Sequence, residues 1–78
     1  MEKFNILYVD DEISNLQGFK SIYFTQYNVI TAVSGREALE ILDEQEVHII
    51  ITDQKMPEMT GVEFLKIVLV EYPRIPRI

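Results

Sequence analysis

The sequence predicts an α/β fold in which strands and helices alternate along the chain. Residues 4–9 (FNILYV) and 47–52 (VHIIIT) are apolar runs rich in β-branched or aromatic side chains, as expected of strands covered on both faces. Residues 27–33 form a third such run, and a segment with helical spacing of its apolar residues follows each of the three. The order β-α-β-α-β-α indicates a parallel sheet joined by helices.

The middle strand differs from the other two in its pattern. Within residues 27–33, Val29, Thr31 and Val33 alternate with Asn28, Ile30 and Ala32. A mixture of this kind is more typical of a strand at the edge of a sheet than of a central one. We therefore expect residues 27–33 to form an edge strand.

Each predicted helix begins at a capping-box pattern, in which a hydroxyl and a side-chain carbonyl three residues later bind each other's backbone N–H groups. The three patterns are Ser14-Asn15-Leu16-Gln17, Ser34-Gly35-Arg36-Glu37 and Thr60-Gly61-Val62-Glu63. The residues expected to face the core are Leu16, Phe19 and Tyr23, then Ala38, Ile41 and Leu42, then Val62, Leu65 and Leu69. Two prolines end the last helix, and the tail after them has the composition of a beginning strand.

Composition narrows the range of partners. The 78 residues carry a formal charge of −6, which argues against direct contact with nucleic acid or anionic lipid. No cysteine is present, so disulfides and zinc-cysteine sites are excluded and a reducing, cytoplasmic location fits. No apolar run is long enough to span a membrane, and the run after Lys3 is too short for a signal peptide.

Three aspartates follow the two most apolar strands. Asp10 and Asp11 come directly after residues 4–9, and Asp53 comes directly after residues 47–52. If these strands are parallel neighbours, the three carboxylates meet at one rim, where open α/β sheets bind ligands. Each pair at about 5 Å repels by roughly 3 kcal/mol at an effective dielectric of about 20. The pattern therefore favours a site that binds a hard divalent cation.

Several other residues are expected to have structural rather than functional roles. Met56 and Met59 are expected to pack rather than to recognise a ligand, and His48 is expected to be structural or partly exposed. The acidic run at residues 43–46 is expected to be a solvated helix end. Lys55 is interpreted as a solvated loop cation.

The run ILYVDDE, the Asn15 after it and the run ITDQKMPEMTGVEFL, with the spacing between them, resemble the receiver domain of two-component response regulators. The resemblance covers the whole chain. It implies a flavodoxin-like fold, here β-α-β-α-β-α with parallel strand order 2-1-3. It also implies a signalling domain rather than an enzyme, one that accepts a phosphoryl group from a sensor histidine kinase.

The resemblance assigns roles to individual residues. Asp53 would be the phosphorylated aspartate. Asp11 would bind Mg²⁺ directly, Asp10 directly or through water, and the carbonyl of Lys55 would supply a further oxygen. Residues 54–61 would shape the site, with Gly61 opening the third helix. Such a shell of carboxylates, a carbonyl and waters suits Mg²⁺, and phosphoryl transfer needs little more than a nucleophile and charge stabilisation.

A complete receiver has two further strands and helices, which carry a hydroxyl residue and a lysine that contact the phosphoryl group. We therefore expect residues 1–78 to be a single partial receiver domain, and we expect self-association through the exposed edge of the strand at 47–52. One alternative is a truncated or engineered fragment that serves as a folding or assembly unit without switching. Another is an aspartyl-phosphate phosphohydrolase, which predicts a second acid two residues after the nucleophile. That position is Lys55 for Asp53, which does not fit, and Glu12 for Asp10, which fits weakly. The output domain and pathway are not specified by the sequence.

Overall fold

The computed structural model describes residues 3–77 and confirms the alternation of strands and helices. The elements are β1 (Asn5–Val9), α1 (Ile13–Tyr23), β2 (Asn28–Ala32), α2 (Gly35–Glu44), β3 (Ile49–Thr52) and α3 (Gly61–Glu71). Each strand is slightly shorter than the apolar run that predicted it.

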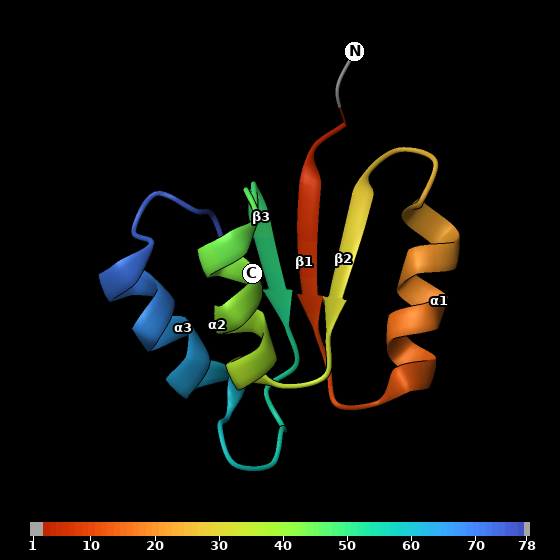
Figure 1. Cartoon of the computed structure of the whole chain (residues 1–78). Helices are drawn as coiled ribbons and strands as arrows, with labels where there is room; N and C mark the ends of the chain where they lie inside the picture. Colours follow the sequence, from red (N-terminus) through yellow and green to blue (C-terminus); the bar gives the residue numbers. More distant parts are fainter. Residues whose placement is uncertain (1–2, 78) are drawn as a thin grey trace.

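The three strands form one parallel sheet in the order β2-β1-β3, as predicted (Figure 1). Leu7 in the central strand lies opposite Ile30 of β2 and Ile50 of β3. The strand β2 is at an edge, which its mixed sequence pattern indicated. Because all three strands run in the same direction, their carboxyl ends lie along one rim of the sheet.

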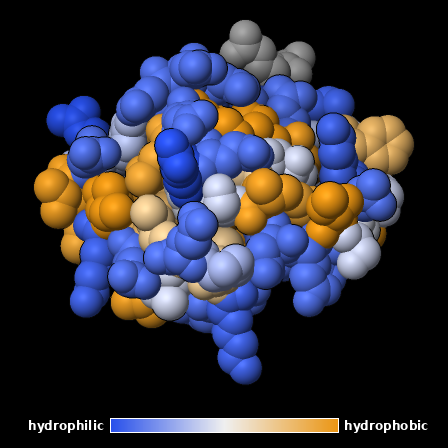
Figure 2. All heavy atoms as spheres, turned by 60° about the horizontal axis from the view of Figure 1, so that its bottom comes forward, coloured by the Kyte–Doolittle hydropathy of each residue, from blue (hydrophilic) through white to orange (hydrophobic). Residues whose placement is uncertain are grey.

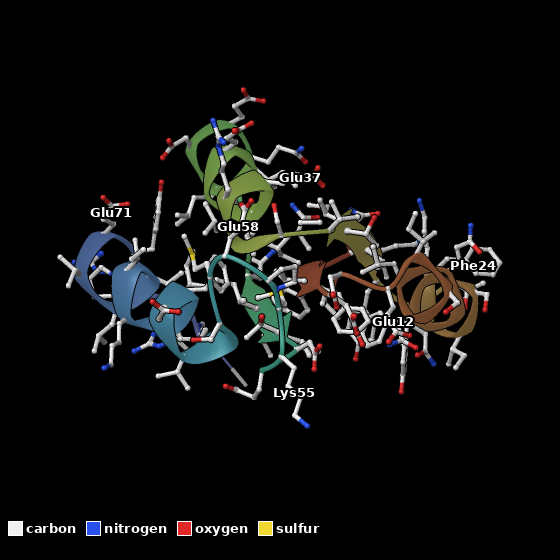
Figure 3. All side chains as sticks on the ribbon, turned by 90° about the horizontal axis from the view of Figure 1, so that it is seen from below. Glu12, Phe24, Glu37, Lys55, Glu58 and Glu71 are labelled. Atoms are coloured by element: carbon white, nitrogen blue, oxygen red, sulfur yellow. The ribbon has the colours of Figure 1, made fainter. Side chains whose placement is uncertain are left out.

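Helices cover both faces of the sheet. Figures 1 and 3 show α2 and α3 on one face and α1 on the other. The main core lies under α2 and α3, and its largest fully buried side chains are those of Leu7, Val9, Ile50, Phe64 and Val68. Met56, from the loop after β3, is buried in the same core, which confirms its predicted packing role.

The caps of α2 and α3 match the sequence patterns. The Ser34 hydroxyl accepts a hydrogen bond from the Glu37 N–H at 3.1 Å. Thr60 and Glu63 form a full capping box. The Glu63 N–H donates to the Thr60 hydroxyl at 3.1 Å, and the Thr60 N–H donates to the Glu63 carboxylate at 3.0 Å. These bonds lower the pKa of the Glu63 carboxyl.

The predicted start of α1 is wrong. The helix begins at Ile13 with Glu12 as its N-cap, so Ser14 lies inside the first turn rather than before it. The reason is the side chain of Asp10, whose Oδ1 accepts a hydrogen bond from the Glu12 N–H at 2.9 Å. This bond closes a turn directly after β1, of the kind that aspartate favours, and the helix therefore starts earlier than its sequence signal suggested.

The predicted core face of α3 is wrong in part. Leu65 packs against the core as predicted, but the buried side chains of this helix are Phe64 and Val68, and Val62 and Leu69 are about half exposed. Seven of the eleven residues of α3 have apolar side chains, so the spacing of its apolar residues fits more than one face. The start of α3 at Gly61 lies close to the preceding loop, as described below.

The C-terminal tail begins to pair with β3. The Ile50 N–H donates to the Pro76 carbonyl at 3.0 Å, and Ile50 forms a parallel bridge with Arg77. The outer edge of β3 is therefore not open along its whole length, contrary to the expectation from the sequence, because the proline contributes a carbonyl acceptor even though it lacks an N–H donor. Between residues 3 and 77, no helix has the length and apolarity needed to cross a membrane.

Candidate metal and phosphoryl-acceptor site

The three predicted aspartates meet at the carboxyl-terminal rim of the sheet. Oxygens from the carboxylates of Asp10, Asp11 and Asp53 all lie within 4.8 Å of one another. Backbone hydrogen bonds that extend the sheet fix two of these residues. The Asp10 N–H donates to the carbonyl of Ala32 at 3.0 Å, and the Asp53 N–H donates to the carbonyl of Val9 at 2.8 Å.

Asp10 is the buried member of this cluster, with 3% of its surface exposed. Both of its carboxylate oxygens are hydrogen-bonded. Oδ1 accepts from the Glu12 N–H, and Oδ2 accepts from the Tyr8 hydroxyl at 3.1 Å and from the Asn15 side-chain amide at 3.0 Å. Three donors on one carboxylate compensate for the loss of water around a buried charge. Asp11 is exposed and Asp53 is partly exposed.

Tyr8 is a site residue that was not anticipated from the sequence. It precedes Asp10 by two residues, so strand alternation places both side chains on the α1 face of the sheet. Partial burial, the hydrogen bond to Asp10 and the negative charges of Asp10 and Asp53 together raise the pKa of the Tyr8 phenol. The two-residue spacing between Tyr8 and Asp10 is the sequence feature from which this placement could have been predicted.

The loop after β3 is held tightly against the start of α3. The Gly61 N–H donates to the Gln54 carbonyl at 3.2 Å, and a β carbon at position 61 would overlap the backbone carbonyl oxygen of Asp53. Glycine is required there by this close approach. In the same loop, Glu58 adopts a positive φ of 68°, a conformation that L side chains seldom adopt.

Lys55 lies in this loop with its side chain exposed and pointing outward (Figure 3). That placement agrees with its interpretation as a solvated cation. The predicted role of its backbone carbonyl stays a prediction. His48, the other residue set aside as structural, accepts a hydrogen bond from the Asn5 N–H at 2.8 Å and pairs with Glu46 at 3.0 Å, at the opposite end of β3 from Asp53.

Hydrophilic side chains cover much of the molecular surface around this rim, with apolar patches between them (Figure 2). An exposed and a partly exposed carboxylate beside a buried, hydrogen-bonded one form an oxygen-rich site open to solvent. Such a site can bind a small hard cation and still leave room for water and a further oxygen ligand.

Comparison with known protein families identifies the domain. The family model described as response regulator receiver domain matches residues 6–78. The chain belongs to this family. Among curated relatives of this receiver domain, the hydrogenase transcriptional regulatory protein HoxA of Cupriavidus necator is 41% identical over 73 residues, which are 94% of this chain and 15% of HoxA. The two-component response regulator ORR3 of rice is 44% identical over 64 residues, covering 80% of this chain and 49% of ORR3.

Solved structures agree. The chemotaxis protein CheY4 of Vibrio cholerae superposes with a TM-score of 0.90 and 38% identity, covering 96% of this chain and 65% of CheY4. The response regulator TrrA of Thermotoga maritima, solved in complex with Mg²⁺-BeF, gives a TM-score of 0.87 and 27% identity, covering 95% of this chain and 65% of TrrA. The chain thus spans about half or less of the curated relatives above and about two thirds of these receiver structures.

Proposed function

We propose that Asp53 accepts a phosphoryl group from a sensor histidine kinase, and that Asp10, Asp11, Asp53 and the Lys55 carbonyl hold Mg²⁺ beside it. The observation that carries this proposal is the convergence of three carboxylates from the ends of two adjacent strands within 4.8 Å. Membership of the receiver family supports it. So does the related TrrA, whose structure contains Mg²⁺-BeF.

The site residues suit this chemistry. Asp53 is partly exposed, so its carboxylate can approach the phosphorus atom of a phosphohistidine. The phosphorus–oxygen bond forms as the phosphorus–nitrogen bond breaks, and the imidazole leaves with the bonding electron pair. The bound cation would neutralise charge on the phosphoryl oxygens. Asp10, which is held by three donors, and Asp11, which is exposed, would hold that cation.

We also propose that residues 1–78 are the N-terminal portion of a receiver domain. Two observations support this. The chain covers 61% to 65% of several solved response regulator structures, and the tail begins a parallel pairing with β3 at Arg77. A further strand beside β3 would continue this pairing. The hydroxyl and lysine groups expected from the family would then come from sequence beyond residue 78.

The direct test is phosphorylation by acetyl phosphate, followed by intact-mass spectrometry with and without Mg²⁺. We expect one phosphoryl group that depends on Mg²⁺ and is lost in Asp53→Asn. Asp43→Asn, which removes a carboxylate from α2 away from the site, is the matched control and should be phosphorylated normally. Phosphorylation of Asp53→Asn at the normal rate would refute the assignment of the acceptor.

The same experiment separates the two alternatives. A fragment that serves only as a folding or assembly unit would bind the cation and remain unphosphorylated. A phosphohydrolase would release inorganic phosphate rapidly from the donor while holding little phosphate on the protein. A receiver accumulates phosphoprotein toward one phosphoryl group per chain and releases inorganic phosphate only as fast as the acyl phosphate on Asp53 hydrolyses.

A further inference from the structure

We propose that Tyr8 is a positioning residue that restricts Asp10 to one-point contact with the cation and so favours Mg²⁺ over Ca²⁺. The inference rests on the metal site in the proposed function and goes beyond it, because it concerns which cation the site selects. The hydroxyl of Tyr8 donates to Oδ2 of Asp10 at 3.1 Å.

The count of lone pairs on Asp10 leads to this inference. A carboxylate oxygen has about two lone-pair positions. On Oδ2, one is directed to Tyr8 and the other to the Asn15 amide. On Oδ1, one is directed to the Glu12 N–H. A single position on Oδ1 is left for a metal, so Asp10 cannot chelate a cation through both oxygens while these donors are in place.

The Tyr8 hydroxyl is held in position by a row of aromatic rings. The ring of Tyr8 lies 4.5 Å from that of Phe19, centroid to centroid, and Phe19 lies 4.8 Å from Tyr23. Both partners belong to α1, which packs on this face of the sheet. Asp10 is 3% exposed and the Tyr8 ring is partly buried against α1, so both ends of the hydrogen bond are restricted by their packing.

This arrangement distinguishes between the two common hard cations. Mg²⁺ takes six oxygens in near-octahedral geometry and suits ligands that each contribute one atom. Ca²⁺ takes six to eight oxygens and often uses both oxygens of a carboxylate. Blocking Oδ2 of Asp10 therefore costs Ca²⁺ a ligand that Mg²⁺ does not need. Removal of the Tyr8 hydroxyl frees one position on Oδ2 and also loosens the carboxylate.

The test compares cation affinities of the protein and of Tyr8→Phe. Mn²⁺ binding is followed by electron paramagnetic resonance, and Mg²⁺ and Ca²⁺ are measured by competition. We expect Tyr8→Phe to weaken Mg²⁺ binding by about tenfold, the usual effect of losing a residue that orients a metal ligand, while Ca²⁺ binding is unchanged or tighter. Asn15→Ala, which removes the other Oδ2 donor, should change the ratio in the same direction.

Tyr23→Phe is the matched control, because it removes a hydroxyl from the same row of rings at the end away from Asp10. It should leave both affinities unchanged. Equal weakening of Mg²⁺ and Ca²⁺ in Tyr8→Phe, or no change in either, would overturn the inference while leaving the metal site intact. Absence of cation binding by the unsubstituted protein would instead overturn the proposed metal site, and this inference with it.

Discussion

Replacement of Gly61 by alanine should destabilise the protein, although alanine is the better helix former. Gly61 is the first residue of α3. A β carbon at this position would overlap the Asp53 carbonyl oxygen, and it would lie 3.0 Å from the Cα atom of Gln54 and 3.1 Å from the carbonyl carbon of Asp53. All three are backbone atoms, so no side-chain rotation relieves the contact. The loop or the helix must move.

The expected magnitude follows from two opposing effects. Alanine gains about 1 kcal/mol over glycine inside a helix. Overpacking of a well-packed region costs about 1–3 kcal/mol, and an overlap with backbone belongs at the upper end of that range. We therefore expect Gly61→Ala to lower the free energy of unfolding by about 2 kcal/mol.

Gly18→Ala is the matched control. Gly18 lies within α1, and a β carbon there would have no heavy atom within 4 Å apart from its chain neighbours and the backbone of its own helix. The substitution should therefore raise the free energy of unfolding by about 1 kcal/mol.

Urea unfolding followed by circular dichroism measures both effects, provided that the dependence of the free energy on urea is the same for all variants. For a domain of this size, each 1 kcal/mol corresponds to a change of about 4–8 °C in melting temperature. The amide resonance of Asp53 should shift in Gly61→Ala and stay in place in Gly18→Ala. A Gly61→Ala variant at least as stable as the unsubstituted protein would refute the close approach of α3 to the Asp53 backbone.

In metal-free buffer, Asp53→Asn should stabilise the fold by about 1 kcal/mol in thermal unfolding. This gain is smaller than the repulsion of roughly 3 kcal/mol between two like charges about 5 Å apart at a dielectric of about 20, because water reaches Asp53. Mg²⁺ should reduce the gain, and a loss of stability would contradict repulsion in the cluster. Glu58→Gly should stabilise by about 0.5–1 kcal/mol in urea unfolding, since glycine adopts a positive φ without strain, and a loss would show that the loop needs the side chain. The hydrogen bond to Asp43 raises the pKa of Tyr72 to about 12 from 10.0, so the stability it contributes is present below pH 10 and declines as pH rises from about 10 to 12. Tyr72→Phe should flatten this decline in a pH series of unfolding curves, and an unchanged decline would rule out the bond. Finally, the chain should self-associate through the exposed apolar side of α3 and the part of the β3 edge that the tail leaves unpaired. Val70→Lys should weaken the association in sedimentation equilibrium, and a monomer at every concentration would contradict it.

The arrangement of the strands and the position of the acids could be predicted from the sequence. Apolar runs directly before Asp10 and Asp53 identified two buried strands, and the resemblance to receivers supplied the order 2-1-3. Once parallel neighbours are assumed, geometry brings their carboxyl ends together. The clustering of Asp10, Asp11 and Asp53 within 4.8 Å follows from this simple relation between sequence position and strand direction.

The start of α1 and the core face of α3 could not be predicted in this way. In α1, a hydrogen bond from the Glu12 N–H to the Asp10 side chain outweighed the local signal at Ser14. In α3, the apolar residues surround the helix, so periodicity gave no single phase. The close approach of Gly61 to Asp53 and Gln54 is likewise a contact between segments that sequence spacing does not describe.

The acidic end of α2 also makes a contact that the sequence did not predict. Residues 43–46 were interpreted as a solvated helix end, and that run is exposed. The Asp43 carboxylate nevertheless accepts a hydrogen bond from the hydroxyl of Tyr72, the residue that follows α3. Because α2 and α3 are neighbours on the same face of the sheet, this bond joins the ends of two helices. Only their packing could reveal it.

Asp10 joins folding and function in one side chain. Its Oδ1 fixes the turn that starts α1, and its Oδ2 binds Tyr8 from the strand and Asn15 from the helix. The first acid of the pair would therefore be favoured at this position even without a cation. Among the described residues, the hydrogen bonds of Asp53 run through its backbone, and its carboxylate has no comparable structural task. Asp53 and Asp11 are consequently stronger indications of a cation site than Asp10, whose carboxylate is already fixed by these hydrogen bonds.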